Sequence, residues 1–241
     1  MKLPDYLVLG ECKCGTSSIY SYLTQHPQIL KTYGNGLDNY LGTKELRFFD
    51  RYYDKGLDWY ASRFPDTQPD EITGECASVY FGRTISLYRI KKDIPHVKTI
   101  VLLRNPVDRL YSHYCHKQKW IPNWGNQYSS FEHFITSAYE EDNYLIEKGI
   151  YITMLSKWFK EFPGQVMVVE SESLFNDSQN TCNLIFDYLG IKQFELESFK
   201  KLNNSSISII NPTAKEILQE FYRPYNEELY SFLGYRMSWD D

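Results

Sequence analysis

The chain has no long apolar run. No stretch approaches the ~20 residues that a membrane span requires, and the amino terminus lacks the apolar core of a signal peptide. Its five cysteines, at positions 12, 14, 76, 115 and 182, include no C-x-x-C pair, which is unlike a secreted domain built on disulfides. We therefore expect a soluble, cytoplasmic protein with reduced thiols and no membrane contact.

An excess of positive charge is also missing. The formal net charge is -5, and the lysines and arginines form no long stripe, which argues against nucleic acid as a partner. His113 and His116 are spaced i, i+3 but have no third ligand in register, so we expect no metal. No linker rich in proline or glycine divides the 241 residues, and we expect a single domain, residues 1–241.

What is present begins with a predicted anion-binding turn. The apolar run Tyr6-Leu7-Val8-Leu9-Gly10 predicts a short buried strand, and Lys13-Cys14-Gly15-Thr16-Ser17-Ser18 follows it and opens a helix. The N–H groups and dipole of a helix N-terminus favour an anion, and this segment adds one ammonium and three hydroxyls. Lys13 precedes Gly15 instead of following it, which disfavours nucleoside triphosphate hydrolysis. The alternative is a Ser/Thr-capped helix with a surface lysine.

A second junction of strand and helix follows the β-branched, apolar residues 98–103. An asparagine N-cap and a proline at the first helical position place Arg104 at the carboxyl end of the strand, where open α/β sheets bind ligands. Arg109 and Ser112, spaced i, i+3, share a helix face and with Arg104 indicate a second phosphate site. The alternative is an arginine paired with a carboxylate such as Asp108.

The order of these patterns predicts the fold class. Strand patterns lie near residues 6–10, 99–103 and 166–170, and helix patterns near 16–25, 106–118, 144–160, 178–189 and 212–233. Their alternation predicts an α/β protein with a P-loop-like three-layer fold, a mostly parallel central sheet and helices on both faces. Residues 33–39 and 120–126 lack periodicity, and these aromatic-containing loops either line an acceptor pocket or pack against the domain.

Three further segments complete a recognisable order. They are Lys44-Glu45-Leu46-Arg47-Phe48-Phe49-Asp50, the segment from Gly74-Glu75 to Tyr80, and Phe221-Tyr222-Arg223-Pro224-Tyr225-Asn226. With the two junctions above, they resemble sulfotransferases that use 3′-phosphoadenosine 5′-phosphosulfate (PAPS), of the heparan-sulfate-like and bacterial kind. The first two resemble that family's K-E-x-x-F-F-D and G-E-x-S-P-x-Y elements, and the third resembles its closing helix. The similarity runs from about Tyr6 to Gly234.

The resemblance implies roles for individual residues. It assigns the 5′-phosphosulfate to Lys13, Cys14, Gly15, Thr16, Ser17 and Ser18, the 3′-phosphate to Arg104 and Ser112, further nucleotide contacts to Asn204 and Ser205, and the acceptor side to Lys44, Arg47 and Tyr80. Glu45 becomes the base that takes the proton of the acceptor hydroxyl. Lys13 stabilises the charge that grows on the oxygen between sulfur and phosphate as that bond breaks. Without the family context, Lys44 and Glu45 are equally well a surface ion pair.

Two positions depart from the family pattern. Cys76 stands where relatives often carry a lysine near the active centre, so that positive charge is missing or comes from elsewhere, with Arg47 as one candidate. Arg47 itself stands where many relatives have histidine. The family's lysine-glycine-arginine segment is not visible, and residues 202–206 resemble its asparagine-serine version or are a polar loop before the last helix.

From these observations we expect a PAPS-dependent sulfotransferase that transfers a sulfuryl group to a hydroxyl by in-line displacement and leaves adenosine 3′,5′-bisphosphate. A small metabolite, as in natural-product biosynthesis, fits the acidic chain better than a long sulfated glycan, although amine acceptors stay open. The chain begins almost directly on its first strand, which suggests a part of a multidomain assembly. The alternatives are a kinase-like phosphotransferase, which would require magnesium, and a catalytically silent nucleotide-binding protein.

Overall fold

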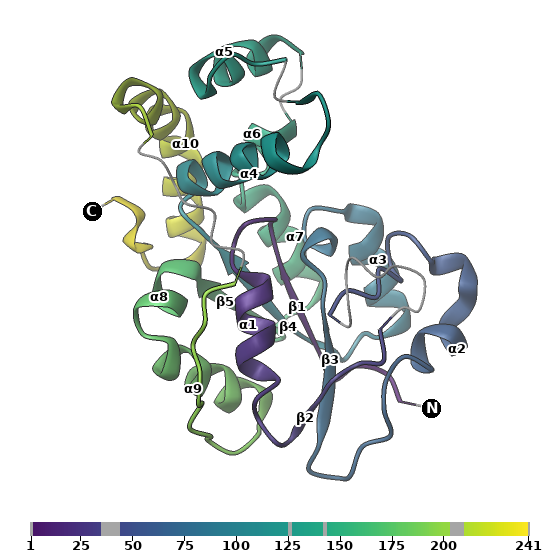
Figure 1. Ribbon diagram of the computed structural model, residues 1–241. Helices are drawn as coiled ribbons and strands as arrows, with labels where there is room; N and C mark the ends of the chain where they lie inside the picture. Colours follow the sequence, from purple (N-terminus) through teal and green to yellow (C-terminus); the bar gives the residue numbers. More distant parts are fainter. Residues whose placement is uncertain (1, 35–43, 125–126, 142–143, 203–209, 241) are drawn as a thin grey trace. The chain divides into compact units, whose positions relative to one another are not determined.

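Five parallel strands form the central sheet (Figure 1). The computed structural model describes residues 2–34, 44–124, 127–141, 144–202 and 210–240. The strands are β1 (Tyr6–Gly10), β2 (Ile29–Leu30), β3 (Ile72–Cys76), β4 (Lys98–Leu103) and β5 (Val166–Glu170), in the spatial order β2-β3-β1-β4-β5. Every described strand pair is parallel, which confirms the predicted sheet.

The chain divides into two compact units. Unit 1 comprises residues 1–103 and 157–203, and unit 2 comprises residues 104–156 and 204–241. All five strands belong to unit 1, together with helices α1 (Thr16–Leu23), α2 (Gly56–Ala61), α3 (Thr84–Asp93), α8 (Ser171–Asn176) and α9 (Ser178–Leu189) and the 3₁₀ turns η1 (Tyr53–Lys55) and η2 (Ser78–Tyr80). Unit 2 contains helices α4 (Pro106–Trp120), α5 (Phe131–Glu141), α6 (Tyr144–Glu147) and α10 (Pro212–Leu233) and the turn η4 (Ser238–Asp240), and α7 (Ile152–Glu161) begins in it.

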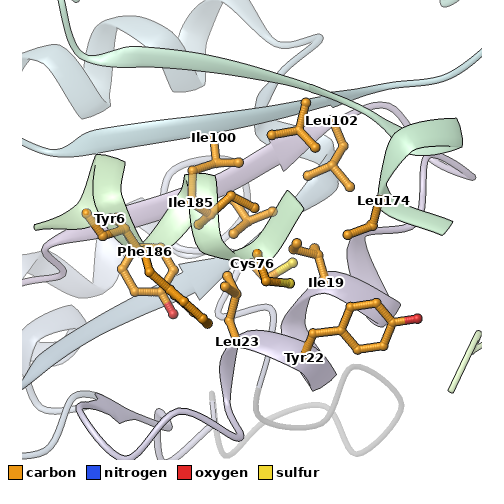
Figure 2. Packing of buried hydrophobic residues seen from close by; sticks show 14 of the residues in the cluster. Tyr6, Ile19, Tyr22, Leu23, Cys76, Ile100, Leu102, Leu174, Ile185 and Phe186 are labelled. Atoms are coloured by element: carbon orange, nitrogen blue, oxygen red, sulfur yellow. The ribbon is translucent and has the colours of Figure 1, made fainter. Parts of the chain in front are cut away.

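The sheet of unit 1 is covered on both faces. Successive side chains of a strand point to opposite faces, and all five residues of β1 are buried. One face packs against α1, α8 and α9, in a cluster that includes Tyr6, Val8, Ile19, Leu102 and Phe186 (Figure 2). Helix α3 lies on the other side of the sheet in Figure 1. This arrangement confirms the predicted layers.

Unit 2 has an aromatic core of its own. Its cluster joins α4, α5, α6 and α10 and includes Tyr111, Phe131, Phe134 and Tyr222. The Tyr222 hydroxyl donates to the carbonyl oxygen of Ile146 at 2.8 Å. Within the described ranges, neither unit contains a helix long and apolar enough to cross a membrane.

The structure corrects one predicted helix. Residues 144–160 are not continuous, because α6 ends at Glu147 and α7 begins at Ile152. A Cβ at Gly149 would lie 2.6 Å from the Tyr222 ring, so this contact with α10 requires a glycine between the two helices. Strands β2 and β3 were not predicted: β2 has only two residues, and β3 carries a glycine and a glutamate in place of an apolar run.

Candidate active site

The loop between β1 and α1, residues 11–15, has the backbone of a tight turn. Lys13 and Gly15 have left-handed conformations, with φ of 78° and 92°. This conformation is rare for lysine and stores strain of a kind that clusters at functional sites. Gly15 is also required sterically, because a Cβ there would lie 3.1 Å from the Phe175 ring.

The N-terminus of α1 is open to an anion. Gly15 takes the N-cap position, where no side chain caps the helix, and the first turn holds no acidic residue. Helix α4 differs, because the Asn105 side-chain oxygen accepts from Val107 N at 3.0 Å and Asp108 N at 3.4 Å. The positive end of the α1 dipole is therefore available to stabilise an anionic ligand.

Three distant segments of unit 1 hold this turn through hydrogen bonds. Ser171 Oγ donates to the Cys14 carbonyl, Leu202 N donates to Ser18 Oγ at 3.0 Å, and Cys76 Sγ donates to the Thr16 carbonyl at 3.0 Å. Ser18 is fully buried, so its hydroxyl serves to hold the segment that leads to residue 203. The predicted nucleotide contacts Asn204 and Ser205 lie outside the described residues.

Lys44 joins the first turn of α1 to Glu45. Its Nζ donates to Thr16 Oγ1 at 3.5 Å and lies 3.0 Å from Glu45 Oε1. The two side chains are only 17% and 7% exposed, unlike a surface ion pair. Burial by itself would lower the pKa of Lys44, but the acidic groups of Cys76 and Glu45 beside it outweigh burial and raise that pKa. A charged ammonium and a carboxylate therefore stand next to the anion-binding turn.

Arg47 pairs with a different carboxylate, that of Asp50. Its guanidinium binds both oxygens of Asp50, with Nε at 2.8 Å from Oδ1, and Asp50 raises the pKa of Arg47 further. Lys44, in contrast, interacts electrostatically with Cys76. Lys44 and Arg47 were both predicted for the acceptor side. Of these two cations, Lys44 is the one beside Cys76, the position where family members often carry a lysine.

Glu75, to which no role was assigned from sequence, is fully buried near the end of β3. Its Oε1 accepts from Leu46 N at 2.7 Å, Arg47 N at 3.0 Å and the Tyr80 hydroxyl at 2.9 Å, and its Oε2 accepts from the Tyr60 hydroxyl at 2.8 Å. Burial raises the pKa of Glu75 to about 7, while these four donors act in the opposite direction. Tyr80, expected at the acceptor side, is therefore fully buried with its hydroxyl on Glu75. The available sequence signal was the resemblance of the segment from Gly74-Glu75 to Tyr80 to a family element.

In unit 2, Arg104 directly precedes Asn105, the N-cap of α4, and Ser112 lies in the second turn of this helix. Tyr151 anchors the backbone of Arg104 by donating to its carbonyl oxygen at 2.8 Å, and Ser112 is 3% exposed. Arg109 is fully buried, and its Nη2 donates to the Leu145 carbonyl at 2.5 Å. Its guanidinium therefore bonds to the backbone within unit 2, and a role of Arg109 in a second phosphate site stays a prediction.

The candidate acceptor loops are only partly described. Tyr33 is exposed, and residues 35–39 lie outside the described ranges. In the second loop Trp124 packs against Tyr114 and Phe134, as a core residue does, whereas Trp120 is exposed. The packing alternative thus applies to Trp124.

The sequence is similar to that of known proteins. The sulfotransferase domain model matches residues 3–223. Heparan sulfate glucosamine 3-O-sulfotransferase 3B1 of Homo sapiens is 30% identical, across 99% of this chain and 65% of its own length. Bifunctional heparan sulfate N-deacetylase/N-sulfotransferase 2 of Bos taurus is 28% identical, across 80% of this chain and 22% of its own length. The chain therefore spans less than two thirds of either relative.

Solved structures show the same fold. A sulfotransferase from Alicyclobacillus acidocaldarius superposes with a TM-score of 0.78 at 24% identity, covering 100% of both chains. Mouse sulfotransferase SULT7A1 complexed with PAP superposes with a TM-score of 0.52 at 13% identity, covering 90% of this chain and 62% of that one.

Proposed function

Because the chain belongs to the sulfotransferase domain family, we propose that it transfers a sulfuryl group from PAPS to a hydroxyl of an organic acceptor and releases adenosine 3′,5′-bisphosphate. The observation that carries this proposal is the buried Lys44–Glu45 pair beside Thr16, in the uncapped first turn of α1. It combines an anion-binding turn, a cation and a carboxylate in one compact unit.

The residues of the β1–α1 turn fit the 5′-phosphosulfate of the donor. The turn offers the open N-terminus of α1, and Gly15 adopts the left-handed backbone that forms it. Lys13, Cys14, Gly15, Thr16, Ser17 and Ser18 are assigned to this group, with Ser18 acting through its buried contact to Leu202. We assign the 3′-phosphate to Arg104 and Ser112, because a guanidinium binds phosphate in a bidentate manner, and further nucleotide contacts to Asn204 and Ser205.

The donor supplies an activated sulfuryl group, and the chain's own residues manage charge and proton. Glu45 takes the proton from the acceptor hydroxyl while the bond from acceptor oxygen to sulfur forms and the bond from sulfur to the phosphate oxygen breaks. Lys13 stabilises the negative charge that grows on that phosphate oxygen. Lys44 keeps a positive charge between Glu45 and the β1–α1 turn, which favours an anionic donor there.

For the acceptor we propose a small metabolite, as in natural-product biosynthesis. Arg47 and Tyr80 are assigned to the acceptor side of the site, because both donate to Glu75 and so support residues 44–47. The net charge of -5 supports this choice. A glycan is the second candidate, because the curated relatives are named for heparan sulfate. A cytoplasmic location, a metal-free mechanism and membership in a multidomain assembly stay predictions.

Nucleotide binding tests the proposal first. We would measure calorimetric binding of adenosine 3′,5′-bisphosphate, with adenosine 5′-monophosphate and ATP plus magnesium as comparison ligands. Binding should require the 3′-phosphate, and Arg104→Ala should weaken it roughly 10- to 100-fold, the loss expected when a hydrogen-bonded charged partner is removed. Arg236→Ala is the matched control, since it removes an exposed arginine that pairs with Glu227 in the same unit.

The outcomes separate the remaining classes. Preference for ATP plus magnesium would favour the kinase-like phosphotransferase. Tight binding of the bisphosphate without turnover of PAPS across hydroxyl, amine and heparan sulfate acceptors would favour the silent binding protein. Turnover of small hydroxyl acceptors alone would favour the metabolite, and turnover of heparan sulfate alone would favour the glycan.

A further inference from the structure

Hydrogen bonds to β3 bracket Glu45. The carbonyl oxygen of Lys44 accepts from Cys76 N at 2.9 Å, and Leu46 N donates to Glu75 Oε1 at 2.7 Å. The residues on either side of Glu45 are thus tied to two consecutive residues of one buried strand. The end of β3 therefore sets the position of the Glu45 backbone.

The Glu75 carboxylate also stabilises an unfavourable backbone at Arg47. Arg47 has a φ of 61°, which is uncommon for a residue with a side chain. Its N–H donates to Glu75 Oε1 at 3.0 Å. One carboxylate oxygen thus receives two consecutive N–H groups of the turn, and removing it would take the acceptor from both donors.

Two tyrosines join the same carboxylate to the residues after the turn. Tyr60 donates to Glu75 and stacks on Phe48 with ring centroids 4.6 Å apart. Tyr80 donates to Glu75, accepts from Phe49 N at 3.3 Å and packs edge-on against the Phe49 ring. Burial beside Glu75 raises the pKa of both tyrosines well above the ordinary value, so both hydroxyls keep their protons and remain donors.

We propose that Glu75 is a positioning residue for the transfer reaction: its carboxylate, held by Tyr60 and Tyr80, anchors the turn of residues 44–47 and so places Glu45 against the acceptor hydroxyl. The inference rests on the proposed function. Glu75 acts through Glu45 and not by its own chemistry, so an uncharged side chain with the same acceptor should serve.

Paired substitutions at Glu75 separate positioning from charge. Glu75→Leu keeps the size of the side chain and removes the acceptor, whereas Glu75→Gln offers an oxygen to the three donors at Oε1 and an NH₂ group to the Tyr60 oxygen. Glu75→Leu should lower kcat about 100-fold, the cost of misplacing a reacting group by roughly 1 Å. Glu75→Gln should keep kcat within about threefold of the wild type. Calorimetric affinity for adenosine 3′,5′-bisphosphate should be unchanged in both.

Hydrogen exchange gives a readout that does not depend on activity. The amides of Leu46 and Arg47 should exchange at least about tenfold faster in Glu75→Leu than in wild type and Glu75→Gln. If Glu75→Leu does not fold, Tyr80→Phe replaces it, with an expected fall in kcat of about tenfold. Tyr188→Phe is the matched control, because it removes a tyrosine hydroxyl that donates to the Thr99 carbonyl near the start of β4, and it should leave kcat and exchange unchanged.

Each result has one meaning. Equal loss of kcat in Glu75→Gln and Glu75→Leu would overturn the inference, because the charge would then be the requirement. Unchanged kcat and unchanged exchange in Glu75→Leu would overturn it as well. If the wild type transfers no sulfuryl group, the proposed function fails, while exchange at Leu46 and Arg47 still decides whether Glu75 anchors the turn.

Discussion

Lys44 and Glu45 are adjacent in the sequence and form a 3.0 Å ion pair between Nζ and Oε1, with both side chains largely buried. Because Lys44 also donates to Thr16, the base and the anion-binding turn share one cation. Adjacent residues of an extended segment point in opposite directions, so this pair requires the turn that bends residues 44–47.

Removing the cation should lower turnover. We predict that Lys44→Met lowers kcat about 100-fold, as the loss of one preorganised charge at a reacting centre does. Lys92→Met, at an exposed lysine of α3, is the matched control and should leave kcat unchanged. Steady-state kinetics with PAPS measure both, and equal kcat in wild type and Lys44→Met would show that the pair is structural.

Removing the carboxylate should separate chemistry from binding. We predict that Glu45→Gln lowers kcat at least about 100-fold, since general base catalysis contributes typically that much or more. Affinity for adenosine 3′,5′-bisphosphate should change little, because Glu45 serves the acceptor. Steady-state kinetics measure the fall in kcat, and calorimetry measures the affinity for the nucleotide. Unchanged turnover in Glu45→Gln would show that Glu45 is not the base.

Glu75 should make the protein less stable as the pH rises. Its pKa is about 7 in the folded state and near 4.5 when unfolded, so between these values the folded state binds more protons. The free energy of unfolding therefore falls with rising pH over that window, by at most about 1.4 kcal/mol per pH unit. Glu75→Gln should lose this slope in urea denaturation between pH 4.5 and 7.5. The facing groups are the Tyr60 and Tyr80 hydroxyls, which remain protonated throughout.

His113 should make the protein less stable as the pH falls. Burial, followed by the nearby Arg109 guanidinium, lowers the pKa of His113 to about 2, and Arg109 Nη1 donates to its Nδ1 at 3.3 Å. The unfolded chain takes up the proton near pH 6.5, so this contribution to stability is present above pH 6.5 and is lost as the pH falls. In His113→Asn the acid loss of stability should be shallower. Urea denaturation measures this loss. If the free energy of unfolding falls equally steeply with falling pH in wild type and His113→Asn, His113 does not make this contribution.

The cysteines should differ in reactivity. Burial raises the pKa of Cys76 and of Cys182 to about 12, and Cys14 is also buried, whereas Cys12 and Cys115 are half-buried. Because the thiolate is the reactive form, iodoacetamide at pH 8 should label Cys12 and Cys115 first, and peptide mass spectrometry reports the order. Any inhibition by peroxide should then follow Cys12 and disappear in Cys12→Ser. Labelling of Cys76 as fast as Cys12 would refute this order.

The two junctions of strand and helix were predictable because their signals are local. A buried strand followed by Gly15 and three hydroxyl residues, and another followed by an asparagine N-cap, each occupy fewer than about 20 consecutive residues. Strand β3 gave no such signal, because Gly74 and Glu75 interrupt its apolar pattern. The break between α6 and α7 also escaped prediction, since it depends on the contact of Gly149 with Tyr222 on α10.

The sequence by itself determined the fold class, because strand and helix patterns alternate along the chain, and it predicted the anion-binding turn after β1 from one short segment. It indicated Glu45 as the candidate base only through the resemblance to a family element. Only the tertiary structure decided which cation accompanies Glu45 and what holds its turn in place. The hydrogen bonds Lys44–Thr16, Leu46–Glu75 and Tyr60–Glu75 join residues that are 28, 29 and 15 positions apart in the sequence. No local pattern reports such contacts, because they form only when parallel strands bring their carboxyl ends to one edge of the sheet.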